Sequence, residues 1–211
     1  MLINELAKAV HENAVAHGWW DDEREAPEII ALIHSEWSEA LEEARAGRPL
    51  VWYRPDPDFK CCATSKCGAY IDGVICHGPS GLCFPPCPMQ RKPEGIAVEL
   101  IDGCIRILDY MGRLKSEITE NDGCASEIES LYSDANVEKI PDKVPEVIAY
   151  LHLNTSGALA NGLTFVNVFA LLHAMALALS WVKKQGLDPL AILLEKHEYN
   201  KCRPYKHGKK F

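Results

Sequence analysis

The feature that most constrains the fold is the stretch 93–118, PEGIAVELIDGCIRILDYMGRLKSEI, which has the periodicity of a helix. Apolar residues cover most of the circumference of this helix, so we expect it to be largely buried. Its charged residues form one narrow stripe: Glu99, Asp102, Arg106, Asp109 and Arg113. Taken alone, the stripe is best explained as the solvent face of the helix, with Asp102 and Arg106 as an i,i+4 ion pair.

The remaining periodic segments also predict helices, and nothing predicts a run of alternating strands. The expected helices lie at 3–18, 27–47, 146–162, 163–182 and 188–204. Between them, 50–93 loses its periodicity and is rich in Pro, Gly and Cys. The sequence therefore predicts a single all-α domain over 1–211, a helical bundle with an irregular Cys-rich insertion at 50–93.

Charge is distributed unevenly over the 211 residues. The net charge of -8 argues against stable nucleic-acid binding, because a phosphate backbone needs a basic surface. The last 16 residues nevertheless hold six of the 22 Lys and Arg residues, a composition suited to a polyanion such as a metal-bound phosphate. No positively charged segment followed by an apolar run opens the chain, so we expect a cytoplasmic protein with reduced or metal-bound cysteines.

The segment 163–182 contains 20 residues without a formal charge, which is long enough for a membrane helix. Asn167, His173 and Ser180 interrupt its apolar character. These polar residues favour a buried or subunit-interface helix over a membrane helix, and we expect no membrane association.

Two pairs of carboxylates lie on two of the expected helices. Glu36 and Glu39 are three residues apart, as are Glu99 and Asp102, so each pair projects from one side of its helix. If the two helices pack with these sides facing, four carboxylates converge and need a counter-charge. Oxygen ligands without His or Cys favour Mg²⁺ or Mn²⁺, and the lack of Glu-x-x-His pairs argues against a ferritin-like di-iron site.

The segments that carry these carboxylates resemble a known family. SEWSE at 35–39 and VELID at 98–102 read as ExxE followed by ExxD. Together with KHEYNKCRPYKHGKK at 196–210, they resemble the MazG-like family of all-α nucleoside triphosphate pyrophosphohydrolases, of the phage and bacterial type. The resemblance implies a helical bundle that forms a homodimer or homotetramer. It also implies Mg²⁺-dependent hydrolysis of a (deoxy)nucleoside triphosphate to the monophosphate and pyrophosphate, for pool control or housekeeping.

The resemblance also assigns roles to individual residues. The residues that match the family's catalytic metal ligands are Glu36, Glu39, Glu99 and Asp102. Those that match its K-x3-N-x2-basic pattern, which contacts the triphosphate or sugar, are Lys196, Asn200 and Arg203. The chain departs from the family in one respect, because about 60 residues separate its two carboxylate pairs. Which carboxylate accepts a proton from the attacking water stays open.

Two further questions have alternative answers at this stage. A structural Zn²⁺ site with Cys62, Cys67, Cys83 and Cys87 as ligands competes with free thiols on a loop, because the spacings are wider than CxxC. For the whole chain, the alternative to an enzyme is a non-catalytic nucleotide-binding regulator or scaffold that docks through its Cys-rich module.

Overall fold

The computed structural model describes residues 1–55, 70–71, 74–75, 91–114, 127–133, 139–159 and 167–208, and most of these are helical. The all-α class predicted from periodicity is confirmed. The α-helices are α1 (Ile3–Ala16), α2 (Ala26–Arg45), α3 (Ile96–Leu114), α4 (Ser130–Ser133), α5 (Val144–Gly157), α6 (Val168–Lys184) and α7 (Pro189–Lys201). A short 3-10 helix, η3 (Tyr205–Gly208), follows them.

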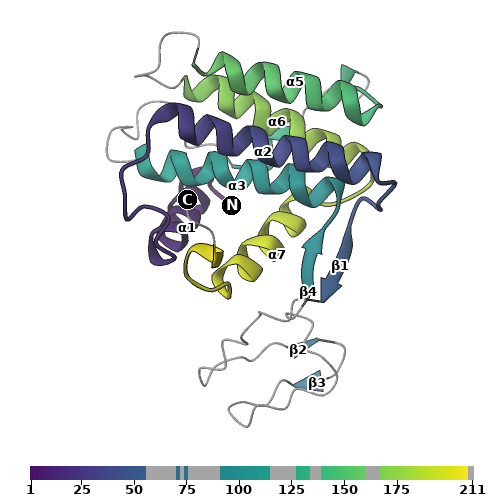
Figure 1. Ribbon diagram of the computed structural model, residues 1–211. Helices are drawn as coiled ribbons and strands as arrows, with labels where there is room; N and C mark the ends of the chain where they lie inside the picture. Colours follow the sequence, from purple (N-terminus) through teal and green to yellow (C-terminus); the bar gives the residue numbers. More distant parts are fainter. Residues whose placement is uncertain are drawn as a thin grey trace.

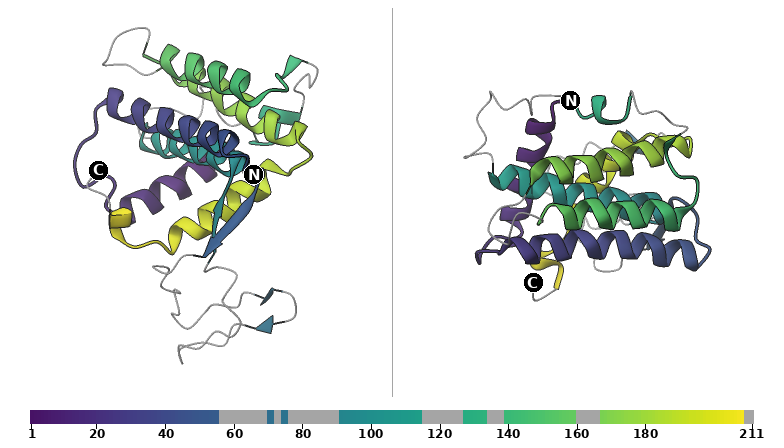
Figure 2. Two further views of the ribbon diagram at one scale, coloured as in Figure 1. Left: turned by 45° about the vertical axis from the view of Figure 1, so that its right-hand side comes forward. Right: turned by 90° about the horizontal axis from the view of Figure 1, so that it is seen from above.

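Four of these helices form a bundle in which each contacts two neighbours. Helix α2 packs on α3 and α5, and α6 packs on the same two helices from the other side. Figures 1 and 2 show α2, α3, α5 and α6 running alongside one another, with α1 and α7 crossing beneath them. Because α1 and α7 both pack on α3 as well, α3 is the central helix of the fold.

The central position of α3 follows from its apolar surface. Its buried side chains include Leu100, Ile101, Cys104, Ile107 and Leu108, which lie on several sides of the helix. One residue of the charged stripe is also enclosed, since Glu99 is only 3% exposed. The interpretation of the stripe as a solvent face is therefore wrong for its first turn, because α2 and α7 also pack on this helix.

Short strands join the segment 50–93 to the bundle. Strand β1 (Trp52–Pro55) pairs antiparallel with β4 (Arg91–Glu94), so the two ends of the segment form a ladder. A second small ladder joins β2 (Tyr70–Ile71) to β3 (Val74–Ile75). Figure 1 shows the β1–β4 ladder projecting from the ends of α2 and α3. The sequence predicts an irregular insertion at 50–93, of which 56–69, 72–73 and 76–90 lie outside the described residues.

The described part of the uncharged segment, 167–182, becomes part of the bundle core. Helix α6 buries Leu171, Ala174, Met175, Ala178 and Leu179 against its neighbours. Within the described ranges, no helix has both the length and the apolar character needed to cross a membrane.

The contact between α2 and α3 depends on a glycine. We expect Gly103→Ala to lower the free energy of unfolding by about 1–3 kcal/mol, the usual cost of overpacking a core. The added Cβ would overlap the ring of Trp37, which is fixed by a 2.9 Å hydrogen bond from its Nε1 to Oγ1 of Thr155. Urea denaturation measures the change. Gly157→Ala at the end of α5 is the matched control, because nothing lies within 4 Å of its added Cβ. Equal effects of the two substitutions would contradict this account of the packing.

Candidate functional site

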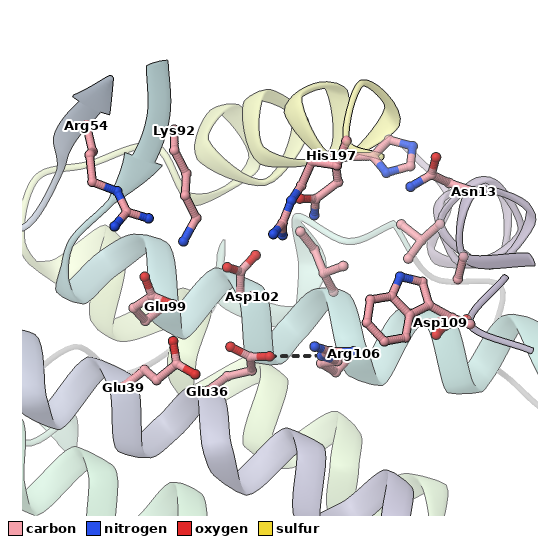
Figure 3. A pocket seen from close by; sticks show the side chains of 16 residues that line it. Asn13, Glu36, Glu39, Arg54, Lys92, Glu99, Asp102, Arg106, Asp109 and His197 are labelled. Atoms are coloured by element: carbon pink, nitrogen blue, oxygen red, sulfur yellow. Dashed lines mark hydrogen bonds and ion pairs between the residues drawn. The ribbon is translucent and has the colours of Figure 1, made fainter. Parts of the chain in front are cut away.

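A cavity of about 280 Å³ lies where α1, α2, α3, α7 and the β1–β4 ladder meet. Its wall is strongly charged along one side (Figure 3). The residues that line it are Val10, Asn13, Ala14, Trp19, Glu36, Glu39, Arg54, Lys92, Glu99, Asp102, Ile105, Arg106, Asp109, His197, Asn200 and Arg203. All four carboxylates predicted from the sequence are among them.

Three of the four carboxylates form a tight cluster. Glu36 from α2 and Glu99 and Asp102 from α3 each offer an oxygen, and these oxygens lie within 4.8 Å of one another. Glu39 is exposed on the same wall, one turn along α2 from Glu36 (Figure 3). Carboxylate oxygens brought together in this way fit a hard divalent cation such as Mg²⁺ or Mn²⁺.

Two cations of the chain already compensate part of this charge. Arg106 donates from Nε to Oε1 of Glu36 at 2.9 Å, so it bridges to α2 instead of pairing with Asp102 on its own helix. Lys196 from α7 contacts Oδ2 of Asp102 at 2.8 Å and donates to the backbone carbonyl of Pro93 at 3.0 Å. The carboxylate cluster is therefore held between α2 and α7 by ion pairs.

The pKa of Glu99 is strongly raised. Burial and the negative charge of Asp102 raise its pKa to about 9, although Lys196 opposes the shift. Its protonated carboxyl group is hydrogen-bonded to Glu94 on β4. Burial also raises the pKa of Glu36, and the opposing charge of Arg106 only partly offsets this. Burial and neighbouring carboxylates thus disfavour the charged forms of Glu36 and Glu99, which is the condition that a bound divalent cation relieves.

The three residues predicted from the C-terminal pattern occupy two different positions. Asn200 and Arg203 line the cavity. Lys196 lies behind the wall, 1% exposed, with its ammonium group on Asp102. The opposite end of helix α7 is capped, since Oδ1 of Asp188 accepts from the backbone N–H groups of Leu190 and Ala191 at 3.0 and 3.2 Å.

Two buried polar atoms of the cavity wall have no hydrogen-bond partner among the described residues. They are Nε2 of His197 and Oδ1 of Asn200, both on α7. Burying polar atoms without partners is costly, so native structures rarely leave them in this state without a reason. A polar ligand in the cavity would supply the missing partners.

The end of the cavity nearest α1 is less charged. Val10, Ala14 and Ile105 line it together with Trp19, which is 8% exposed. Trp20 lies apart from this wall and donates from Nε1 to Oδ1 of Asp109 at 2.9 Å. An apolar patch with one aromatic ring beside a charged wall suits an amphipathic ligand with a ring at one end and charge at the other.

Sequence reasoning missed three charged residues of the site, Arg54, Lys92 and Glu94, because all lie on the short strands β1 and β4. Oε1 of Glu94 lies 2.9 Å from Nη2 of Arg54 and 2.9 Å from Nζ of Lys92. Burial alone would raise the pKa of Glu94, but its hydrogen bond to Lys92 and the charge of that residue lower it. The signal RKPE shortly before α3 could have indicated Lys92 and Glu94, because it places charged residues next to the first turn that carries Glu99, but it does not include Arg54.

The proposed zinc ligands Cys62, Cys67, Cys83 and Cys87 lie outside the described residues. Comparison of the chain with protein-family models, with curated proteins and with solved structures found no match. The site therefore has to be interpreted from its own chemistry and from the resemblance of its sequence segments.

Proposed function

We propose that the protein is a nucleoside triphosphate pyrophosphohydrolase that uses Mg²⁺, with Mn²⁺ as a substitute. The observation that carries this proposal is the cluster of Glu36, Glu99 and Asp102 in the wall of a cavity. It supports the function implied by the resemblance to the MazG-like family, because these three residues and Glu39 match that family's metal ligands. The predicted product pair is the nucleoside monophosphate and pyrophosphate.

Each part of the cavity has a task in this proposal. Bound Mg²⁺ would supply positive charge to the phosphate oxygens and favour ionisation of an attacking water. Glu36, Glu99 and Asp102 would hold the cation, with Arg106 and Lys196 fixing the orientation of two of them. Glu39, exposed beside the cluster, would accept the proton of the water. The partnerless atoms of His197 and Asn200 would bind polar groups of the nucleotide.

One observation favours a second candidate, a nucleotide-binding regulator or scaffold without catalysis. Glu36 and Asp102 already have cationic partners from the chain itself, Arg106 and Lys196. A site compensated in this way could hold a nucleotide without a metal ion. Binding of triphosphates in EDTA, without turnover in Mg²⁺ or Mn²⁺, would identify this alternative.

The experiment that tests the proposal is an incubation of purified protein with each of the eight common ribo- and deoxyribonucleoside triphosphates. Each reaction is run with Mg²⁺, with Mn²⁺ and with EDTA, and phosphorus NMR identifies the products. We expect monophosphate and pyrophosphate from at least one substrate, only in the presence of metal. Diphosphate and orthophosphate as products, or turnover in EDTA, would contradict the proposed reaction. Light scattering of the same sample tests the proposed homodimer or homotetramer.

The metal content of the same purified protein should also be measured. For the Cys-rich segment we propose a structural Zn²⁺ site, with free thiols as the alternative. Zinc that stays bound after exchangeable Mg²⁺ has been removed would support the metal site, and zinc-free reduced protein would support the free thiols.

A further inference from the structure

The β1–β4 ladder places two cations directly opposite each other. Its register pairs Arg54 with Lys92, so their side chains leave the same face of the ladder. Like charges in this relationship destabilise a ladder. Both side chains nevertheless line the cavity, and Figure 3 shows them pointing from the ladder toward the carboxylates. Such a local conflict is characteristic of functional positions.

One carboxylate, that of Glu94, partly compensates the positive charges of Arg54 and Lys92. Both cations approach the same oxygen, Oε1 of Glu94, at 2.9 Å. Glu94 also accepts the hydrogen bond of Glu99, so one carboxylate serves three partners. Arg54 and Lys92 therefore share one carboxylate, and neither has a carboxylate partner of its own in these ion pairs. The Arg54 side chain is 56% exposed, so it can reach an anion without a change in the fold.

The cavity is therefore polar at one end and partly apolar at the other. Arg54 and Lys92 flank Glu99 and Asp102 at one end, and Asn13 and Asp109 lie at the opposite end (Figure 3). Trp19 belongs to the less charged region. A nucleotide has the same polarity, with anionic phosphates at one end and an aromatic base at the other.

We propose that Arg54 and Lys92 form a clamp for the terminal phosphates of the substrate, here called the ladder clamp. The proposal rests on the proposed function and adds the direction in which the substrate lies. The β- and γ-phosphates contact the ladder, the α-phosphate lies over the carboxylates, and the nucleoside extends toward Trp19. Arg54 offers a planar fork and Lys92 a compact charge, two donors suited to phosphate oxygens. The clamp then also holds the pyrophosphate product.

The ladder clamp predicts effects in two directions. In Arg54→Gln/Lys92→Gln, the dissociation constant of inorganic tripolyphosphate should rise by about a hundredfold or more, because two charge-assisted contacts are lost. In Glu94→Gln, the carboxylate that competes with phosphate for both cations is removed, so tripolyphosphate should bind more tightly. Isothermal titration calorimetry at saturating Mg²⁺ measures both. Arg91→Gln is the matched control, since Arg91 is exposed on the same strand and does not line the cavity.

The outcomes separate this inference from the proposed function. If the unaltered protein binds neither tripolyphosphate nor pyrophosphate in Mg²⁺, the proposed function itself is wrong. If it binds them and the double variant binds equally well, only the ladder clamp is wrong. A double variant that fails to fold leaves the decision to Glu94→Gln, where weaker or unchanged binding overturns the clamp. Where turnover is measurable, the clamp requires KM for the triphosphate to rise in Lys92→Gln and to stay unchanged in Arg91→Gln.

Discussion

Replacing Glu99 with glutamine is expected to lower kcat/KM for triphosphate hydrolysis by about a hundredfold or more, because transition-state charge stabilisation by a metal is worth several kcal/mol. The same variant should fold normally without metal. The reason is that the pKa of Glu99 is raised to about 9, so at pH 7 the buried side chain is already neutral and glutamine resembles it. Activity assays and Mg²⁺ titrations by calorimetry measure the first effect.

The stability of this variant provides a second measurement. Because the folded pKa of Glu99 exceeds its unfolded value of about 4.5, the folded chain retains a proton that the unfolded chain loses between pH 4.5 and about 9. Its contribution to the free energy of unfolding is complete below pH 4.5 and is lost as the pH rises toward 9. Glu99→Gln lacks this loss. In urea denaturation in EDTA, the free energy of unfolding of the variant minus that of the unaltered protein should therefore be larger at pH 8 than at pH 5.

A matched control exists on the adjacent helix. Glu42 is exposed on α2 and pairs with Arg45 at the surface. Glu42→Gln should change neither hydrolysis nor Mg²⁺ affinity, and its stability should shift by no more than about 1 kcal/mol. Full activity of Glu99→Gln would remove the basis for the proposed metal site.

The helices could be predicted because their packing leaves a period in the sequence. The expected helix at 93–118 contains α3, and α5 begins at Val144 with Pro145 in its first turn, where proline is favoured. The strands β1 and β4 could not be predicted in this way. Their sequences, WYRP and RKPE, have no apolar alternation, and their pairing joins residues about 40 positions apart.

Helical periodicity predicts only part of the candidate site. Periodicity places Glu99 and Arg113 on one stripe of α3, yet Glu99 is buried and Arg113 is exposed. A helical period identifies the side of a helix but not which turns of that side a neighbour covers. Glu36 can approach Glu99 and Asp102 only if α2 packs on α3. The helical period does not predict this packing, and only the resemblance to a known family implied it.

The C-terminal pattern illustrates the same limit. The spacing of Lys196, Asn200 and Arg203 puts them on one face of a helix, and all three are predicted to bind substrate. In the structure, only Asn200 and Arg203 line the cavity, while Lys196 reaches Asp102 from behind the wall. The depth at which α7 meets α3 decides between these roles, and no local sequence signal encodes it.

Replacing Lys196 with methionine is expected to lower the free energy of unfolding by about 3–5 kcal/mol, the usual effect of removing one partner of a buried ion pair. The Lys196 side chain is 1% exposed and contacts both Asp102 and the carbonyl of Pro93. Methionine fills similar space but leaves Asp102 without its cation. Urea denaturation in EDTA measures the loss. Lys201→Met on the same helix removes an exposed pair with Glu198 and should cost no more than about 1 kcal/mol.

Mg²⁺ should distinguish the two roles that Lys196 can have. If Lys196 is the counter-ion of Asp102, a metal ion at the cluster replaces the lost positive charge, so Mg²⁺ should stabilise Lys196→Met more than it stabilises the unaltered protein. If Lys196 instead contacts the triphosphate, the variant should keep its stability and show a raised KM. A stable variant with a raised KM would therefore return Lys196 to the substrate-binding role predicted from the sequence. If the variant is destabilised and Mg²⁺ restores its free energy of unfolding, Lys196 is the counter-ion of a metal ligand. Asp102 would then bind either the ammonium group or the metal ion.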